Sequence, residues 1–358
     1  MQKTRTNTAT WDDKQNRWQV KVQRDGIRKS FYSSIHGRDG QREANFKADQ
    51  WLDSDVANTK TKVCDLYDDY INEKKLTTSK SNWFYIESRA NKWILPRIGT
   101  KKISKLTENQ MQSVLNDAYS AGLSYKSIAN IRADMTNFVK FCRKRKLTSL
   151  IPEDLYIPKS ATKSTKKILQ PNDLKTLFTH DTIVTYGKTV PEPYINAFRF
   201  QVLTGLRPGE LLALEWADIT NDMVYINKSI NIYGEQTSGK NDNAIRHFAL
   251  NDMTKQILQD QFTYTGDNVR VFPIISQKSY YRRWLNYCKA NNIPHISTYE
   301  LRHTFISIVK NLPAGQVKSL VGHSKNMDTF GVYGHELNGE LKETANCINM
   351  LFENLLDG

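Results

Sequence analysis

Four short motifs in the C-terminal half of the sequence carry residue types that can act together on a phosphate group. A guanidinium stays charged and can hold two phosphate oxygens, a lysine or histidine can move a proton, and a tyrosine hydroxyl can bond covalently to phosphorus. In chain order, the candidate residues are Arg207, Lys240, Tyr299, Arg302, His323 and Tyr333. No carboxylate cluster has the spacing of metal ligands, so we expect chemistry without a metal or another cofactor.

Taken one at a time, these motifs have plainer explanations. Arg207 lies between Gly205 and Pro208 at a predicted helix–turn–helix junction, where an arginine is either a helix C-cap or an anion clamp. Lys240 falls in a turn between two predicted strands, and a lysine at a hairpin tip commonly serves only solubility. Only the whole set, together with the elements that position it, indicates a function.

Those elements form a mixed α and β pattern in residues 161–358. The expected elements are helices at 173–178 and 193–203, strands at 222–233 and 245–250, helices near 276, 299, 315 and 328, and a last amphipathic helix at 338–355. The strands are few and lie close together in the sequence. This region is therefore predicted to be mainly α-helical with a small antiparallel sheet.

A small β-rich domain is predicted at residues 1–57. Apolar and polar residues alternate from Trp18 to Val22, and Asp25-Gly26 supplies a turn before a second strand. Gly40 is expected to precede a helix that starts near Ala44.

Residues 58–160 contain four apolar stripes at helical spacing, which predict a four-helix domain. The second of these helices is expected to stop at Pro96. Residues 157–168 are rich in Pro, Ser, Thr and Lys and predict an extended linker. The predicted fold class is thus a multi-domain α+β protein.

Composition and charge limit the partners. The 358 residues contain 51 Lys plus Arg against 37 Asp plus Glu, a net charge of +14, which favours nucleic acid or an anionic membrane surface. Most of this excess, +9, falls in residues 58–160. No apolar run approaches the ~20 residues that span a bilayer, and the N-terminus lacks the apolar stretch of a signal peptide. The four cysteines form no CxxC pair, so we expect a soluble cytoplasmic protein without a disulfide or zinc framework.

The order of the motifs resembles the catalytic pattern of the tyrosine recombinase, or phage integrase, family. The matching residues are Arg207, then Lys240 in a hairpin, Arg302-His303-Thr304, Gly322-His323, and Tyr333 ten residues after that histidine. Arg246 lies between Lys240 and Leu250, as this family's hairpin motif typically has it. One such motif would be weak, but four in order after a basic helical domain are specific.

The resemblance implies DNA strand exchange through a covalent intermediate. Tyr333 would attack the phosphodiester to give a 3′-phosphotyrosyl bond and a free 5′-hydroxyl, with no need for ATP. Arg207 and Arg302 would hold the transition-state oxygens, the electrostatic work that metal ions do elsewhere. Lys240 would protonate the departing 5′-oxygen, and His323 would donate a hydrogen bond to a nonbridging oxygen or help to move the proton.

One position departs from the family pattern. Three residues before Arg302 the family commonly has histidine, whereas this sequence has Tyr299. A phenol can hydrogen-bond phosphate, but it cannot act as an acid–base group near neutrality as imidazole can. The general base is therefore unassigned, with His295 and His303 as candidates, and Tyr299 is also a rival nucleophile to Tyr333.

By the same resemblance, residues 1–57 look like an arm-type DNA-binding domain, residues 58–160 like a core-binding domain, and residues 161–358 like the catalytic domain. The implied partners are double-stranded DNA at core and arm-type sites, further copies in a homotetramer, a directionality factor and a host DNA-bending protein. The implied location is the bacterial cytoplasm, at the nucleoid when bound to DNA, with no membrane. The C-terminal helix would fold onto its own domain or dock on a neighbouring subunit.

Two alternative functions stay open at this point. The first is a type IB topoisomerase-like enzyme, which would relax supercoils with the same clamp and nucleophile. The second is a non-catalytic DNA-binding regulator derived from an integrase.

Overall fold

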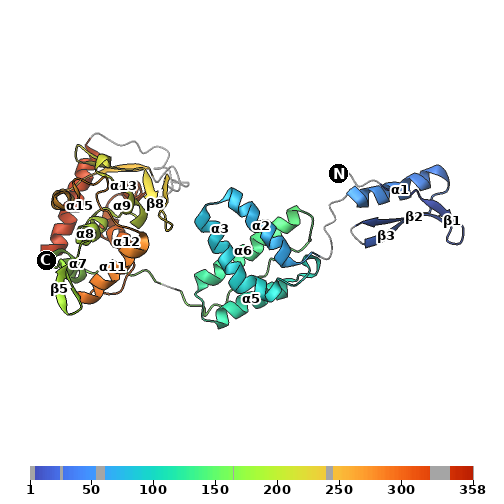
Figure 1. Cartoon of the computed structure of the whole chain (residues 1–358), viewed down its shortest axis with the longest axis horizontal. Coiled ribbons are helices and arrows are strands. Elements are labelled where there is room, and N and C mark those ends of the chain that lie inside the picture. Colours follow the sequence, from blue (N-terminus) through green and yellow to red (C-terminus); the bar gives the residue numbers. More distant parts are fainter. Residues whose placement is uncertain are drawn as a thin grey trace. The chain divides into compact units, whose positions relative to one another are not determined.

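The computed structural model describes residues 5–24, 27–53, 61–163, 165–238, 245–322 and 339–357 (Figure 1). The chain divides into two compact units, residues 1–164 and residues 165–358. Helices dominate and are accompanied by small antiparallel sheets, which confirms the predicted mixed α+β class. Within the described residues, every helix is too short or too polar to cross a bilayer.

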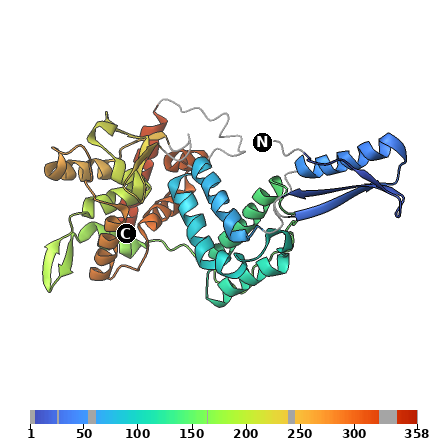
Figure 2. The same ribbon diagram turned by 45° about the vertical axis from the view of Figure 1, so that its right-hand side comes forward.

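The N-terminal segment is a three-stranded antiparallel sheet with a helix on one face (Figure 2). Its elements are β1 (Thr10–Asp12), β2 (Arg17–Arg24), β3 (Ile27–Ser33) and α1 (Gly37–Asp53). The predicted alternation on the second strand is confirmed, because Val20 and Val22 share a buried core with Ala44 and Ala48 of α1. The predicted turn at Asp25-Gly26 lies outside the described residues.

Helix α1 begins earlier than the sequence predicts. Gly40 lies inside the helix, not before it. A Cβ atom at Gly40 would lie 1.7 Å from the carbonyl oxygen of Ile35 and 2.8 Å from the Trp18 ring. Gly40 therefore permits a close approach of the helix to the sheet, and it does not break the helix.

The next segment is a helical bundle with its own core. Its elements are α2 (Val63–Thr77), α3 (Lys80–Arg89), a π-helical turn (Ala90–Ile94), α4 (Leu95–Ile98), α5 (Glu108–Ser120) and α6 (Tyr125–Lys144). Aromatic residues from two helices fill its centre, where Tyr67 stacks on Phe138 with ring centroids 4.6 Å apart.

The prediction that a helix stops at Pro96 is wrong. The helical path continues to Ile98, with Pro96 in the first turn of α4 directly after the π-helical turn. Proline lacks an N–H donor and its ring clashes with the carbonyl four residues earlier in a regular α-helix. The wider π turn separates these groups, so the chain passes the proline without ending the helix.

The C-terminal unit contains most of the described elements. They are α7 (Pro171–Thr179), β4 (Thr182–Thr185), β5 (Lys188–Pro191), α8 (Ile195–Thr204), α9 (Pro208–Ala213), β6 (Ile219–Thr220), β7 (Met223–Ile226), β8 (Lys228–Ile230), β9 (Gln236–Ser238), β10 (Arg246–Ala249), α10 (Asp252–Thr265), α11 (Gln277–Ala290), α12 (Thr298–Ile308), α13 (Ala314–Val321) and α15 (Glu340–Asp357). The β4–β5 hairpin and α10 were not expected from the sequence.

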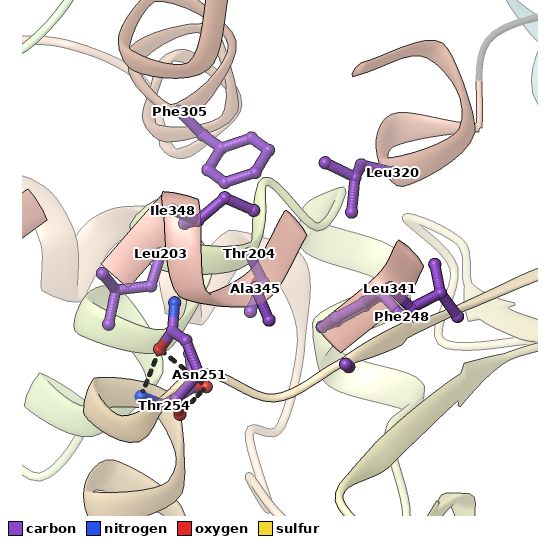
Figure 3. Close-up of a pocket in the computed structure, with 11 residues that line it drawn as sticks. Leu203, Thr204, Phe248, Asn251, Thr254, Phe305, Leu320, Leu341, Ala345 and Ile348 are labelled. Carbon is purple, nitrogen blue, oxygen red and sulfur yellow. Dashed lines mark hydrogen bonds between the residues drawn. The ribbon is translucent and has the colours of Figure 1, made fainter. Parts of the chain in front are cut away.

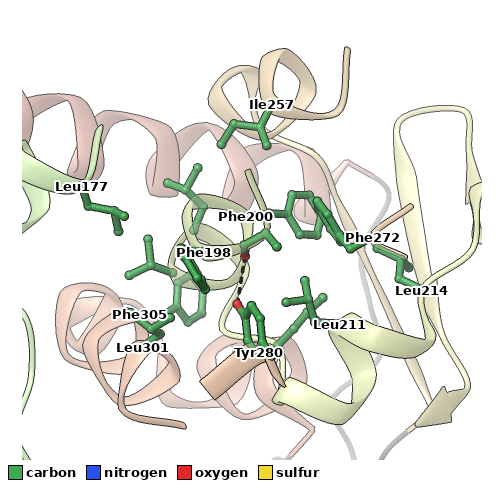
Figure 4. Close-up of a cluster of buried hydrophobic side chains, with 14 of the residues drawn as sticks. Leu177, Phe198, Phe200, Leu211, Leu214, Ile257, Phe272, Tyr280, Leu301 and Phe305 are labelled. Carbon is green, nitrogen blue, oxygen red and sulfur yellow. Dashed lines mark hydrogen bonds between the residues drawn. The ribbon is translucent and has the colours of Figure 1, made fainter. Parts of the chain in front are cut away.

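Helix α8 lies at the centre of this unit and is buried on nearly every side. Figure 4 shows Phe198 directed toward Phe305 and Phe200 directed toward Phe272. The Tyr280 hydroxyl donates a hydrogen bond of 2.8 Å to the Gln201 side chain, so the phenol is satisfied inside the core. The turn that follows α8 is thereby held on a rigid support.

The main sheet of this unit has the strand order β10–β7–β6. Strands β7 and β10 pair antiparallel, with Arg246 opposite Ile226 and Phe248 opposite Val224. These four side chains are buried, so Arg246 belongs to the inner face of its strand. The strand predicted at 222–233 is divided into β7 and β8, and β8 pairs with β9 as a separate hairpin.

The last helix, α15, packs on its own unit. Ile348 and Phe352 are buried in the unit's core, and the Asn349 side chain accepts a hydrogen bond of 3.2 Å from the Met253 backbone. A small cavity lies under the start of this helix, beside Leu320 and Phe305 (Figure 3). The helix predicted near residue 328 lies outside the described residues.

The prediction of an extended linker at 157–168 is wrong for the first half of this segment. Ile157 and Ala161 are buried in the core of the helical bundle. The backbone N–H of Tyr125 also donates to the carbonyl of Thr162 at 2.9 Å. Although the segment is polar in overall composition, these two apolar residues, four positions apart, attach it to the bundle.

The second half of that segment is anchored on α12 of the C-terminal unit. The backbone N–H of Lys167 donates to the Glu300 carboxylate, and that of Leu169 donates to the Thr304 hydroxyl, both at 3.0 Å. Thr162 is thus anchored on the helical bundle and Lys167 on the C-terminal unit.

Candidate active site

Arg207 occupies the turn between α8 and α9. Helix α8 ends at Thr204, and Gly205 adopts the left-handed conformation with φ of 65°. A Cβ atom at Gly205 would lie 2.4 Å from the Phe305 ring, so both the backbone angle and the packing require glycine. Arg207 is the N-cap residue of α9, which corrects the predicted alternative of a helix C-cap.

The Arg207 side chain is held from two directions. Its Nη1 donates to Glu210 at 2.6 Å, and its Nη2 donates to the carbonyl of Gly322 at 3.0 Å. About 29% of the side chain is exposed. These bonds engage only part of the five donors of a guanidinium.

Arg302 lies on α12 and is 1% exposed. Its Nη1 donates to the carbonyl of Gly205 at 2.8 Å, and its Nη2 donates to the carbonyl of Val321. Leu301 and Phe305, on either side of it in the sequence, are buried in the core. The packing of α12 therefore brings Arg302 to the same turn that carries Arg207.

Glu210 and Arg246 form a cluster with Arg207 and Arg302. Neither Glu210 nor Arg246 was predicted as a site residue. Glu210, the third residue of α9, also accepts from the backbone N–H of Arg207 at 2.9 Å. Arg246 donates to the two Glu210 oxygens at 3.1 and 2.8 Å and to the carbonyl of Leu320 at 2.7 Å. Two sequence signals point to them: Glu210 has the spacing of a capping box, and Arg246 alternates with the apolar Phe248 on one strand.

Electrostatics in the cluster follow from its three arginines and one carboxylate. Burial, together with the nearby positive charge of Arg207, lowers the pKa of Arg302 to about 10, so it stays protonated at neutral pH. Burial acts against the charged form of Glu210, but Arg246 and Arg207 outweigh it and lower the pKa of this carboxyl. Burial likewise acts against the charge of Arg207, and Glu210 and then Tyr299 outweigh it and raise its pKa.

Tyr299 lies at the exposed edge of the cluster. Its side chain interacts with Arg207, and its ring meets His303 edge to face at a centroid distance of 5.5 Å. Burial and the nearby charge of Lys166 lower the pKa of His303, which favours the neutral imidazole. His295 has a contact of 3.5 Å with the Tyr281 hydroxyl.

The structure thus brings together Arg207, Arg302 and Tyr299 of the predicted site residues. Lys240, His323 and Tyr333 lie outside the described residues. Among the residues that the structure describes, no group of three His, Cys, Asp or Glu side chains could hold a metal ion. The described part of the site is a fixed pair of guanidinium groups, suited to binding an anion.

Comparisons with known proteins agree with this geometry. Residues 167–340 match the phage integrase family, and residues 63–119 match the phage integrase N-terminal SAM-like domain. The ICEBs1 integrase of Bacillus subtilis (strain 168) is 26% identical over 301 residues, which cover 76% of this chain and 79% of that protein.

Solved structures share the fold. The Tn1549 transposon integrase in complex with transposon right end DNA superposes with a TM-score of 0.64 at 19% identity, covering 81% of this chain and all of that chain. A lambda integrase tetramer bound to a Holliday junction superposes with a TM-score of 0.58 at 15% identity, covering 91% of this chain and 99% of that chain. The family predicted from the motifs is confirmed: the chain belongs to the phage integrase family, the tyrosine-type site-specific recombinases.

Proposed function

We propose that this recombinase is the integrase of a mobile element and that it cuts DNA through a 3′-phosphotyrosyl bond formed by Tyr333, without metal or ATP. The observation that carries the proposal is the meeting of Arg207 and Arg302 at the Gly205 turn. Two guanidinium groups at fixed positions stabilise the negative charge that develops on the phosphate oxygens in the transition state. Because backbone carbonyls and a buried carboxylate hold them in advance, little reorganisation is needed during the reaction.

The other roles follow from the motifs and from the elements that flank them. Lys240 lies in the sequence between β9 and β10, and we assign it the protonation of the 5′-oxygen. His323 follows Gly322, whose carbonyl accepts from Arg207, and we assign it a hydrogen bond to a nonbridging oxygen. Tyr299 supplies a further phosphate hydrogen bond beside Arg207. The 5′-hydroxyl of the partner strand then attacks the phosphotyrosyl bond and releases Tyr333.

We assign arm-site binding to residues 1–57 because of the open face of their sheet. Val20 and Val22 face α1, so the side chains between them on β2 and their partners on β3 form the other face. They are Arg17, Gln19, Lys21 and Gln23 of β2, with Arg28, Ser30 and Tyr32 of β3. A β-ribbon fits the major groove of DNA, where glutamine reads adenine and arginine reads guanine.

We assign core-site binding to residues 58–160 and cleavage to residues 161–358. The helical segment carries the largest charge excess of the chain, and phosphate contacts need such charge. The assembly that we propose is a homotetramer on two duplexes, by analogy with the lambda integrase tetramer on a Holliday junction.

A nicked suicide substrate tests the proposed chemistry. On such DNA the short strand diffuses away after cleavage, so the covalent adduct accumulates. We expect the wild-type chain to form an adduct in the presence of a chelator and without ATP, and we expect peptide mapping to place the DNA on Tyr333. An adduct that requires a divalent metal, or that maps to another residue, would refute the proposal.

Affinity for core-site DNA should fall steeply with salt, because each phosphate contact releases counterions. For six to ten contacts, the dissociation constant should rise by about 10³-fold or more between 50 and 200 mM salt. Fluorescence anisotropy with a labelled duplex measures this. A nearly flat response would show that the basic helical segment is not the binding surface.

Deletion of residues 1–57 should separate the two DNA-binding activities. The core of this segment is separate from that of the helical bundle, so we expect the truncated chain to fold and to cleave core-site DNA within about 3-fold of the wild-type rate. Binding to arm-type DNA should be lost. As a matched control in the full chain, Lys21→Gln should weaken arm binding alone. Loss of core cleavage in the truncated chain would contradict the domain assignment.

A further inference from the structure

Three arginines donate to three consecutive backbone carbonyls at the end of α13. Arg246 donates to Leu320, Arg302 to Val321 and Arg207 to Gly322. The next residue in the chain is His323, and the segment that leads to Tyr333 starts there. The end of α13 is therefore fixed by the same cluster to which we assign phosphate binding.

Arg246 is built into the core to make these contacts. It lies on the inner face of β10, is 8% exposed, and aligns with the buried Ile226 of β7. A buried arginine is costly unless its donors are satisfied. Here two of the Arg246 nitrogens donate to the Glu210 carboxylate, and the third donates to the carbonyl of Leu320.

Arg246 offsets the negative charge of Glu210. Glu210 positions Arg207 by accepting hydrogen bonds from the backbone N–H and from the Nη1 of Arg207. A carboxylate this close would also cancel the positive charge that Arg207 offers to phosphate. The ion pair of Glu210 with Arg246, at 2.8 Å, balances that charge within the protein. Arg207 and Arg302 are then left with their charges available for DNA.

We propose that Arg246 is a positioning residue of the recombinase: it balances the charge of Glu210 and holds the carbonyl of Leu320, so that Arg207 and the end of α13 are correctly placed. This inference rests on the proposed function, since it concerns cleavage by that same site. Arg246 does not touch the DNA in this account, and it acts through Glu210 and Leu320.

The first test compares Arg246→Met and Arg246→Lys in the full-length chain on the suicide substrate. We expect Arg246→Met to slow single-turnover adduct formation by about 100-fold, since small displacements of catalytic groups have effects of this size. Arg246→Lys keeps the charge but cannot reach Glu210 and Leu320 together. Its cleavage rate should therefore lie between that of Arg246→Met and that of the wild type. The dissociation constant for uncut core DNA should stay within about 3-fold of wild type. A folded Arg246→Met variant that cleaves at the wild-type rate would overturn the inference.

A substrate with sulfur in place of the bridging 5′-oxygen separates the role of Arg246 from that of Lys240, which lies six residues before it in the sequence. A thiol has a pKa of about 8.5, so a thiolate leaves without a general acid. This substrate should restore cleavage to a Lys240→Ala variant but not to Arg246→Met. Rescue of Arg246→Met would show that the residue acts through Lys240, contrary to the inference.

A double variant tests the charge balance. Arg246→Met together with Glu210→Gln removes both charges of the pair, so its cleavage should be about 10-fold faster than that of Arg246→Met alone. A purely structural role predicts the opposite, because the second change removes further hydrogen bonds. A double variant that is folded yet no faster than Arg246→Met would refute the charge-balancing role.

Arg283→Met provides the control for loss of a buried ion pair. Arg283 pairs with the buried Glu192 at 2.9 Å on the same unit, and neither residue belongs to the cluster. This variant should lose thermal stability and keep its cleavage rate at temperatures below unfolding. The two failures give different results. If the proposed function is wrong, the wild-type chain forms no adduct on Tyr333. If only the inference is wrong, the wild-type chain forms that adduct and the Arg246 variants form it at the wild-type rate.

Discussion

Replacing Tyr333 with phenylalanine should abolish the covalent DNA adduct and leave DNA binding nearly unchanged. The substitution removes one oxygen atom and keeps the ring, so packing and phosphate contacts are retained while the nucleophile is lost. We expect no adduct above background on the suicide substrate and a dissociation constant within about 2-fold of wild type. Denaturing gel electrophoresis and anisotropy measure the two quantities.

Tyr299→Phe is the matched control, because Tyr299 is the rival nucleophile. Its hydroxyl interacts with Arg207, and its ring contacts His303. Loss of that hydroxyl removes one hydrogen bond to the site, so adduct formation should slow by about 10-fold and still map to Tyr333. If Tyr299→Phe lost the adduct and Tyr333→Phe kept it, the nucleophile would be Tyr299.

Replacing Arg302 with lysine should slow cleavage by about 10³-fold, the effect of losing a fixed donor to a developing oxyanion. Arg302 bridges the Gly205 turn and the end of α13 with its two Nη groups. A lysine ammonium is a compact charge that cannot span both carbonyls. The pKa of Arg302, about 10, is well above neutrality, so the wild-type guanidinium is charged at pH 7, and the substitution removes its two-carbonyl geometry.

Single-turnover rates on the suicide substrate measure this effect, with thermal unfolding to follow stability. Arg199→Lys is the matched control, since Arg199 also bonds two backbone carbonyls, those of Leu177 and His180, at another place in the same unit. It should cost stability without a comparable loss of cleavage. Equal cleavage losses in the two variants would mean that Arg302 contributes only to folding.

The sequence was most informative where local pattern and chemistry agree. Glycine and proline around Arg207 predicted a tight turn, and the turn is present at Gly205. The prediction that Arg207 and Arg302 act together rested on the family motif, and the structure explains it by the packing of α12 against α8. The roles of Lys240, His323 and Tyr333 stay predictions.

Other features depend on contacts that no local pattern encodes. Glu210 and Arg246 form a buried pair across the fold, and neither helical nor strand periodicity links residues so far apart in the chain. Gly40 was expected to precede the helix, but it lies inside α1. Its role depends on the distant Trp18 ring, which no local pattern reveals. Pro96 was expected to end a helix because the π turn before it has no simple sequence signal.

The stretch 323–338, which contains Tyr333, is attached at both ends to one unit. At one end Arg207 binds the carbonyl of Gly322, and at the other α15 is anchored in the core by Ile348 and Phe352. A group on a tethered chain meets its target at an effective local concentration that the tether length sets, commonly in the millimolar range. If Tyr333 is the nucleophile and acts on the arginine pair of its own subunit, its delivery is a unimolecular event, and its rate is independent of protein concentration.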